Sequence, residues 1–372
     1  MNLLPNSHPL SACKTALAAA GLAAVTRADG PEAWDQVWQA LPYQSVDYAA
    51  SMIDYQHAYF RGAGWTLQDL SLVLLADGKP CGIWPLALGG PAENPQLSSA
   101  GTSIVAPALV TGLSPRSVKK IYTHAIEFLR VFCADKGLTN PTLKQNAMPG
   151  LVSQGATEWH QQLMAAGAVV DVRYELYADL RPALPDIRAR FRKSYRPLIN
   201  VGLRAWSHLV MDRTNLKDSV WAEFKQLHRI VAGRVTRTDE TWEKQFLMIG
   251  ADQAFFVSLR DPADQRLVGG AFFQCSRDEG LYAVSAYDRL LFDKPLGHAV
   301  QQIAIETLKA KGLSWYRIGE RCYPQDQPKP TDKEVHISQF KQGFASHLFP
   351  KFEYCLPVSK GDSVTNCANA VQ

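Results

Sequence analysis

The sequence predicts an α/β (α+β) protein with two tandem domains, each a mixed twisted sheet flanked by helices. The chain has 372 residues, which exceeds one typical domain and suits two. Hydrophobic residues make up 47% and charged residues 20%, the composition of a folded globular protein. The same order of elements, helices followed by a hairpin and then strand, helix and strand, recurs in both halves. Because Pro182 and Pro185 punctuate the chain, we expect domains at residues 1–180 and 181–372.

The first half contains a hairpin signal and a long amphipathic helix. Two apolar runs, 72–75 and 81–86, flank Asp77-Gly78, a dipeptide typical of tight hairpin turns. Apolar residues recur at helical spacing between Pro115 and Ala134, which predicts a helix with one buried face that ends before Gly137. Further elements are expected as helices at 31–41, 47–60 and 158–166 and as a strand at 169–180.

The second half begins with a basic segment. A helix from Asp186 is expected to end at Arg196, because Pro197 lacks a backbone donor, and the chain is then expected to run extended to Val210. Thr331 and Glu334 fit a capping box for a helix at 335–345. The remaining expected elements are helices at 219–231, 241–249 and 296–311 and strands at 254–260, 267–275, 281–287, 314–319 and 348–356.

Cysteine usage and hydropathy indicate the cellular setting. Seven cysteines are scattered without a CxxC pair, and an odd number cannot all pair within one chain, which favours a reducing compartment. No uncharged apolar run reaches about 18 residues. The Ala-rich stretch 15–25 is short and follows no compact basic segment, as a signal peptide would. The sequence therefore predicts a cytoplasmic protein with no integral membrane segment.

Several classes of function lack support in the sequence. The net charge of +4 is mild for this length, so overall charge does not argue for nucleic-acid binding. The nine histidines show no HxxxH spacing, so we expect no metal site. A Ser-His-Asp hydrolase is not indicated either, because the chain has no G-x-S-x-G segment.

A helix start near residue 296 is a candidate anion site. An expected strand ending at Tyr287-Asp288 leads to Lys294-Pro295-Leu296-Gly297-His298-Ala299, which opens a helix. Backbone N–H groups in a first helical turn can bind a pyrophosphate, with Gly297 permitting close approach and Lys294 adding charge. Such a start also occurs in helices that are merely capped there.

A second candidate site combines a strand end with a later helix. Glu320 follows Gly319 at the end of an expected strand, where its carboxylate could take a proton from an attacking amine. Lys341, next to Phe340, could offset the negative charge of a tetrahedral intermediate. The structural alternative is that Glu320 and Lys341 are solvated and Phe340 is core.

The third signal is basic. Six Lys and Arg residues lie between Arg188 and Arg204, with Tyr195 among them. On one helix, Arg188, Arg192, Tyr195 and Arg196 would share a side and could grip a phosphate-bearing substrate. A solvated helix face is the alternative.

These signals occur in the order found in a known group of enzymes. Residues 186–350 resemble the acetyltransferase-like domain of the FemAB-like group within the GNAT (N-acetyltransferase) superfamily, and the first half resembles the degenerate first domain of such tandem GNAT-like proteins. The residues that carry the resemblance are Phe191-Arg192-Lys193-Ser194-Tyr195-Arg196, Leu267-Val268-Gly269-Gly270, Tyr287-Asp288, Gly297, Gly319-Glu320, Phe340-Lys341-Gln342-Gly343-Phe344 and, in the first half, Gly82-Ile83-Trp84-Pro85-Leu86.

The resemblance implies an acyltransferase that joins an acyl or aminoacyl group to an amine, with acyl-CoA or aminoacyl-tRNA as donor. It implies that Phe340 and Lys341 lie at the reaction centre and that the donor pyrophosphate binds after Gly297. The sequence departs from ordinary acetyltransferases, because Pro295-Leu296-Gly297-His298 replaces the fuller glycine-rich donor loop. It also lacks the long heptad arm of some FemAB proteins, which makes a role in peptidoglycan bridges less favoured.

Three functional hypotheses follow. The first is N-acylation of an amine on a sugar nucleotide or another cell-envelope or polysaccharide precursor, with Glu320, Tyr287 or a water chain handling the proton. The second is an aminoacyl-tRNA-dependent transferase, motivated by the Arg-rich segment, so tRNA is a possible partner beside a small-molecule acyl donor and an amine acceptor. The third is a binding module that has lost catalysis.

Overall fold

The computed structural model describes residues 9–147 and 157–358 and divides the chain into two compact units. Unit 1 contains the described residues up to Arg173 and those from Pro350 onward, and unit 2 contains Tyr174–Phe349. This division places the residues after Phe349 with unit 1, whereas the sequence analysis assigned them to the second domain. Two long strands pass from one unit into the other, which are β10 (Val169–Asp179) and β16 (His347–Cys355).

Unit 1 packs helices against short, mostly antiparallel sheets. One sheet has the order β1-β3-β4-β8 and another the order β2-β5-β6, while β9 lies between β7 and β16. Its elements are α1 (Pro9–Ala20), β1 (Ala24–Thr26), α2 (Pro31–Ala40), the 3-10 helix Val46–Tyr48, α3 (Ala50–Gly62), β2 (Thr66–Asp69), β3 (Leu72–Ala76), β4 (Lys79–Trp84), β5 (Ala87–Gly90), β6 (Gln96–Ser98), β7 (Ile104–Val105), β8 (Ala108–Leu109), α4 (Pro115–Asp135), β9 (Thr142–Asn146) and α5 (Glu158–Ala165).

The hairpin and the amphipathic helix expected in the first half are confirmed. Strands β3 and β4 pair antiparallel around Asp77 and Gly78, both of which have positive φ, as this tight turn requires. Helix α4 buries Phe128 and Phe132, as its apolar spacing predicts. The Trp84 ring packs edge-on against Phe128, and its indole N–H donates to the Val105 carbonyl at 2.8 Å. The only polar atom of this large buried side chain therefore has a hydrogen-bond partner.

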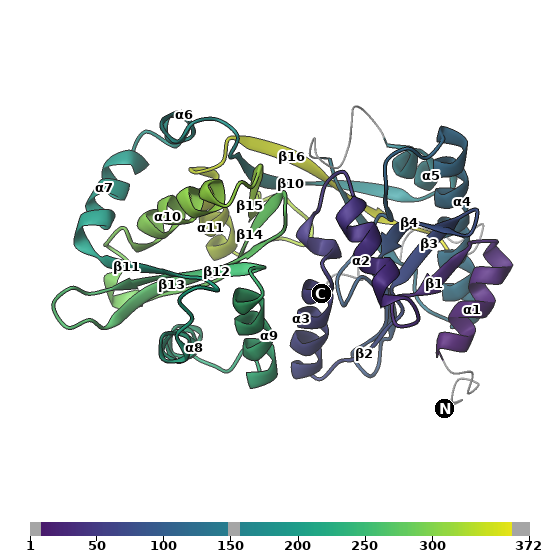
Figure 1. Cartoon of the computed structure of the whole chain (residues 1–372), viewed down its shortest axis with the longest axis horizontal. Helices are drawn as coiled ribbons and strands as arrows, with labels where there is room; N and C mark the ends of the chain where they lie inside the picture. Colours follow the sequence, from purple (N-terminus) through teal and green to yellow (C-terminus); the bar gives the residue numbers. More distant parts are fainter. Residues whose placement is uncertain (1–8, 148–156, 359–372) are drawn as a thin grey trace. The chain divides into compact units, whose positions relative to one another are not determined.

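Unit 2 is a mixed sheet with helices on both faces. The strand order is β11-β12-β13-β14-β15-β10, with α10 over one face and α8 and α9 over the other (Figure 1). Its elements are α6 (Leu184–Ala189), α7 (Tyr195–Ala205), β11 (Ser207–Met211), α8 (Asp218–Ala232), α9 (Asp239–Gly250), β12 (Ala254–Arg260), β13 (Leu267–Cys275), β14 (Glu279–Tyr287), the 3-10 helix Arg289–Leu291, α10 (Leu296–Ala310), β15 (Trp315–Glu320) and α11 (Asp332–Gln342). The predicted mixed α/β class is therefore confirmed.

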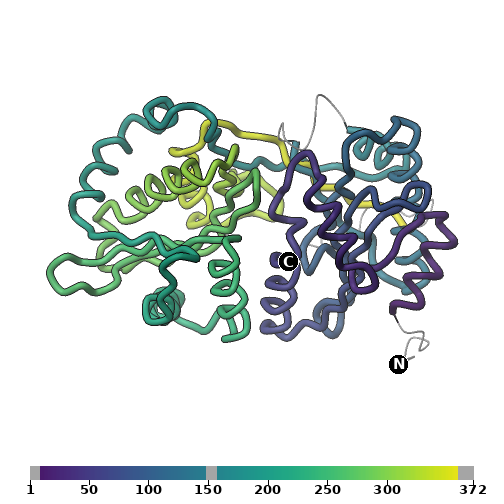
Figure 2. The backbone as a smooth tube through the Cα atoms, in the orientation of Figure 1, coloured from purple at the N-terminus to yellow at the C-terminus, as the bar shows by residue number. Residues whose placement is uncertain are grey.

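The expected end of the basic helix at Arg196 is wrong. The chain leaves α6, turns, and starts a second helix, α7, at Tyr195, so Pro197 lies in the first turn of α7; the path is drawn in teal in Figure 2. A proline is accepted there because the first backbone N–H groups of a helix have no intrahelical partner. The segment expected to be extended up to Val210 is thus helical as far as Ala205.

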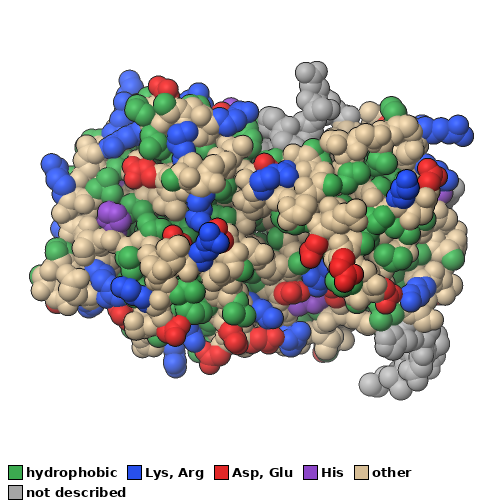
Figure 3. Space-filling model, in the orientation of Figure 1, with side chains coloured by type: hydrophobic (Ala, Val, Ile, Leu, Met, Phe, Trp, Pro, Cys, Tyr) green, Lys and Arg blue, Asp and Glu red, His purple; other side chains and the backbone are tan. Residues whose placement is uncertain are grey.

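Five cysteines of the described chain are free, namely Cys13, Cys81, Cys133, Cys275 and Cys322. On the surface, Lys and Arg side chains are interspersed with Asp and Glu over the face shown in Figure 3, in keeping with the mild net charge.

Strands β14 and β15 separate after a short parallel stretch. Their paired residues run only from Glu279 and Trp315 to Leu281 and Arg317. Beyond that point β14 stays paired with β13 as far as Tyr287, and β15 stays paired with β10 as far as Glu320. Each strand is therefore held by its outer neighbour while the two part from each other.

A buried ion pair lies at the root of this separation. The Arg317 Nε atom is 3.0 Å from a Glu279 carboxylate oxygen, and both side chains are almost fully buried. The pair joins the first residue of β14 to β15 where the strands are still paired. A buried pair of this kind is costly to break, because either partner alone leaves a charge without compensation.

We expect Glu279→Gln to lower the free energy of unfolding by about 3–5 kcal/mol, because it removes the negative charge that lies 3.0 Å from the buried Arg317 guanidinium. Urea denaturation of the full chain measures this change. Asp293→Asn is the matched control, because Asp293 forms its 2.8 Å pair with Lys294 at the exposed surface, and it should leave stability nearly unchanged. Equal losses in the two variants would contradict a special role for the buried pair.

Candidate active site

Lys341 reaches the point where β14 and β15 separate. It lies in the last turn of α11, and its Nζ atom is 5.3 Å from the centre of the Tyr282 ring on β14. A Cβ atom on Gly319 of β15 would lie 2.7 Å from the same Nζ atom. Gly319 has a φ of 130°, a conformation that L side chains rarely adopt, so glycine both permits the backbone geometry and leaves room for the lysine. The ammonium group therefore lies close to both strands.

The surroundings of Lys341 act on its pKa in opposite directions. Burial lowers the pKa, and the nearby Cys322, Glu175 and Glu320 raise it, with burial the larger effect. Lys341 is thus easier to deprotonate than a lysine in water. While it is charged, it is a partly desolvated cation whose attraction for a developing negative charge is little weakened by solvent.

Two tyrosine hydroxyls lie beside this lysine on β14. The hydroxyl oxygens of Tyr282 and Tyr287 are 3.2 Å apart. Burial raises the pKa of both phenols, that of Tyr287 well above its usual value. Tyr287 is therefore a neutral hydroxyl that can relay a proton by accepting one hydrogen bond and donating another, and it is not a base by itself.

Glu320 ends β15, as the sequence predicts. It lies opposite Glu175 of β10 in the antiparallel register, and its charge acts on Lys341. Two carboxylates on neighbouring strands thus face one buried lysine, so a proton donor and potential proton acceptors occur within one electrostatic environment.

Arg321 fixes α11 onto the end of β15, a role that the sequence analysis missed. Its Nε atom donates to the Gln342 side-chain oxygen at 2.8 Å, and an Nη atom donates to the Ser338 hydroxyl at 2.9 Å. Because Ser338 and Gln342 lie four residues apart, both face the same side of α11. In the sequence, this role is indicated only by the four-residue spacing of Ser338 and Gln342 and by the arginine that directly follows Gly319-Glu320. Arg321 thereby sets the position of Lys341.

The Phe340 side chain packs against different elements from those that Lys341 contacts. Its ring lies against Gly297, where an added Cβ would be 3.0 Å from the ring, and its centre is 5.1 Å from that of His298. Tyr195 packs on the same group, with centroid distances of 4.5 Å to His298 and 5.0 Å to Phe344. This aromatic cluster joins α7, the start of α10 and the end of α11.

The predicted substrate-binding residues Arg192, Tyr195 and Arg196 are engaged within the fold. Arg192 donates to the Tyr195 hydroxyl at 3.1 Å and to the Gln339 carbonyl at 3.2 Å, and Arg196 donates to the Ala189 carbonyl. The argument that these residues share one side of a single helix with Arg188 is wrong, because a turn separates α6 from α7. Their role in gripping a phosphate stays a prediction.

The predicted donor-binding residues all lie at the start of α10. Leu296 and Ala299 are buried in the core, and Lys294 pairs with Asp293 at 2.8 Å at the surface. Gly297 and His298 lie against Phe340, so the structure brings this turn next to α11. Pyrophosphate binding by the backbone of the turn stays a prediction.

Metal ligands and membrane spans were also sought within residues 9–147 and 157–358. There, no group of His, Cys, Asp and Glu side chains has the arrangement of a metal site. In the same ranges, no helix is both long enough and apolar enough to cross a membrane.

The fold of the two units is shared with a known class of structures. Unit 2 has a mixed sheet with parting parallel strands and flanking helices, and the described chain has the tandem GNAT-like fold seen in solved FemAB-like structures. It is similar to FemX, with a TM-score of 0.62 and 12% identity over 89% of this chain and 96% of that one.

Two further solved structures have the same architecture. One is a tandem GNAT protein from the clavulanic acid biosynthesis pathway, with a TM-score of 0.51 and 15% identity over 92% of this chain and 99% of that one. The other is L-PGS from Bacillus licheniformis, with a TM-score of 0.50 and 12% identity over 77% of this chain and 86% of that one. No family model and no curated protein matches the sequence.

The aromatic cluster predicts a pH dependence of stability. Burial lowers the pKa of His298 to about 4, whereas an unfolded-state histidine has a pKa of about 6.5. Below about pH 6.5 the unfolded chain gains a proton that folded His298 resists, so stability is lost as the pH falls towards about 4. Burial and Arg237 lower the pKa of His228 to about 4 as well, so it adds to the same effect.

We expect His298→Phe, which keeps an aromatic ring in the cluster, to make the loss of stability between about pH 7 and about pH 5 smaller than in the wild type. Urea denaturation at the two pH values measures this difference. His336→Phe is the control, because His336 is exposed, and it should keep the wild-type pH dependence. An unchanged pH dependence in His298→Phe would contradict the assignment.

Proposed function

We propose that the protein is an N-acyltransferase whose reaction centre lies in unit 2 at Lys341 and the parting of β14 and β15. The observation that carries the proposal is the desolvated Lys341 ammonium beside two strands whose mutual pairing has ended. Backbone groups along the separated strands can hydrogen-bond an extended, amide-bearing chain such as the arm of acyl-CoA. The fold it shares with FemX and a tandem GNAT protein supports the same class of chemistry.

The proposed reaction forms a C–N bond and breaks the bond to the donor. The acceptor amine attacks the carbonyl carbon of the donor thioester or ester, and the carbonyl oxygen becomes an oxyanion. Lys341 stabilises that charge. The oxyanion then collapses, the C–S or C–O bond breaks, and the proton lost by the amine passes through Glu320, Tyr287 or a water chain to the leaving group.

The acceptor that we propose is an amine on a sugar nucleotide or a related cell-envelope or polysaccharide precursor. In this proposal Phe340 shapes the reaction centre, and the turn at Lys294, Leu296, Gly297, His298 and Ala299 binds the donor pyrophosphate. Tyr195 packs on His298 of that turn and Arg192 donates to the Tyr195 hydroxyl, which supports a role on the substrate side for Arg192, Tyr195 and the neighbouring Arg196. Such donors and acceptors are cytoplasmic molecules, so we propose the cytoplasm as the location.

We expect Lys341→Ala to reduce kcat by roughly 100-fold or more while the KM for the donor changes little, because the lysine acts mainly on the transition state. Steady-state kinetics with the donor identified below and an amine acceptor of the proposed class measure both constants. Lys333→Ala, on the exposed part of the same helix, should retain full activity. An unchanged kcat in Lys341→Ala would remove Lys341 from the reaction centre.

The donor is identified by thermal-shift titration of the purified chain with acetyl-CoA, longer acyl-CoAs and free CoA. A ligand at about 100 times its Kd should stabilise the fold by about 2.7 kcal/mol, so saturable stabilisation supports acyl-CoA as donor. Absence of any shift would contradict acyl-CoA use. Binding of aminoacyl-tRNA that weakens steeply with salt would then favour the tRNA-dependent reaction, and no binding of either donor would favour a binding module.

A further inference from the structure

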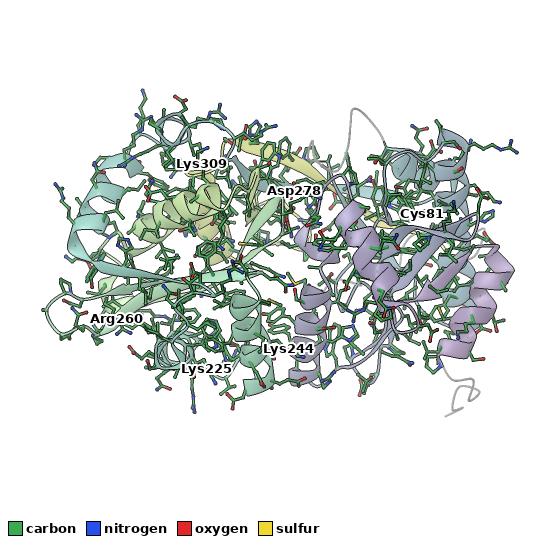
Figure 4. All side chains as sticks on the ribbon, in the orientation of Figure 1. Cys81, Lys225, Lys244, Arg260, Asp278 and Lys309 are labelled. Atoms are coloured by element: carbon green, nitrogen blue, oxygen red, sulfur yellow. The ribbon has the colours of Figure 1, made fainter. Side chains whose placement is uncertain are left out.

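A basic pocket lies between α8 and α9, on the face of the unit 2 sheet opposite α10. Its volume is about 510 Å³, within the range of small-molecule sites. The side chains that matter for its charge are Lys225 and Arg229 of α8 and Arg234 and Arg237 of the connection to α9. Lys225 is labelled on α8 in Figure 4. None of these residues belongs to the candidate active site described above.

The pocket carries uncompensated positive charge. Lys225 is paired with Asp239 at 2.7 Å, which is the acidic residue of the lining. Within the part of the chain that the structure describes, neither Arg229 nor Arg234 has a carboxylate within ion-pair distance or a side-chain hydrogen bond. Like charges crowded around one concavity repel each other, and an anion bound between them removes that repulsion.

Arg237, in the lining of the pocket, is held in place by its neighbours. Its guanidinium lies 5.5 Å from the centre of the Trp242 ring, and it donates to His228 Nε2 at 3.2 Å and to the Thr236 hydroxyl at 3.3 Å. His228 accepts this bond in its neutral form, which fits the low pKa caused by its burial and by Arg237. A guanidinium held in one orientation loses less entropy when it binds an oxyanion.

The residues that line the pocket also indicate which chemical group the pocket binds. Trp242 is 5% exposed, so it offers almost no ring surface for a base to stack on. The lining includes guanidinium groups and the hydroxyls of Thr236 and Thr238, groups that can donate to phosphate oxygens. The two arginines without a carboxylate partner among the described residues, Arg229 and Arg234, match the charge of a diphosphate better than that of a single carboxylate.

We propose that this pocket binds the diphosphate group of a small organic ligand, through Arg229, Arg234 and Arg237 of its lining. The group could come from a free nucleoside diphosphate, from a sugar nucleotide or from the diphosphate of CoA. The proposal does not rest on the acyltransferase assignment, because the pocket and Lys341 lie on different elements.

The test is isothermal titration calorimetry of the full chain at low salt with inorganic pyrophosphate, UDP and CoA as separate ligands. Saturable binding of pyrophosphate and UDP is expected, weakening as salt is added. Tighter binding of UDP than of pyrophosphate would indicate a nucleotide source, and tighter binding of CoA would indicate the acyl donor. No saturable binding of any of the three would overturn the proposal.

The double variant Arg229→Gln/Arg234→Gln should weaken pyrophosphate binding by roughly tenfold or more, because two charge-assisted contacts are lost. Both side chains are exposed, so the variant should keep the wild-type melting temperature. The matched control is Arg116→Gln/Arg213→Gln, which removes the same net charge from exposed positions outside the pocket. Equal weakening in the control would mean a diffuse charge effect and would overturn the site. Binding of an RNA oligonucleotide through these arginines without binding of pyrophosphate would overturn it in favour of a nucleic-acid surface.

Discussion

The parting of β14 and β15 organises unit 2, because it places strand ends where a helix from later in the chain can reach them. The parting is stable because each strand keeps its full antiparallel partner, β13 on one side and β10 on the other. The buried pair of Glu279 and Arg317 joins the strands just before they diverge. Gly319 and Tyr282, which lie next to Lys341, are themselves paired with β10 and β13.

Helix α11, which carries Lys341, is held in place at both of its ends. Its start is fixed by a capping box in which the Thr331 hydroxyl accepts from the Glu334 N–H and the Glu334 carboxylate accepts from Thr331. Its last turns are fixed by Arg321, which is tied to Ser338 and Gln342. With both ends fixed, Lys341 and Phe340 are directed to opposite neighbourhoods, the lysine to the strands and the phenylalanine to the start of α10.

The sequence predicted the parts of unit 2 that follow from local rules. The capping box at Thr331, the hydrophobic strands and the helix after Gly297 depend on neighbours in sequence, so their patterns are legible there. The prediction at Pro197 was wrong because a proline stops a helix only in its interior and is accepted in a first turn. Whether Pro197 lies in a first turn depends on where α6 ends, which the sequence does not show. Arg321 and Tyr282 could not be found, because their roles come from contacts between segments distant in sequence.

The surroundings of Lys341 bear on two roles that a buried lysine can have, that of a base and that of a cation. If burial acted alone, the amine would lose its proton readily and could serve as a base. Glu175 and Glu320 act against this, because their negative charges favour the ammonium form. A carboxylate at the strand end is also a better acceptor for the proton of an attacking amine than an ammonium group, which already carries its own proton. In the proposed reaction the two functions are divided between neighbouring groups, with Lys341 holding the oxyanion and Glu320 or the Tyr287 relay taking the proton.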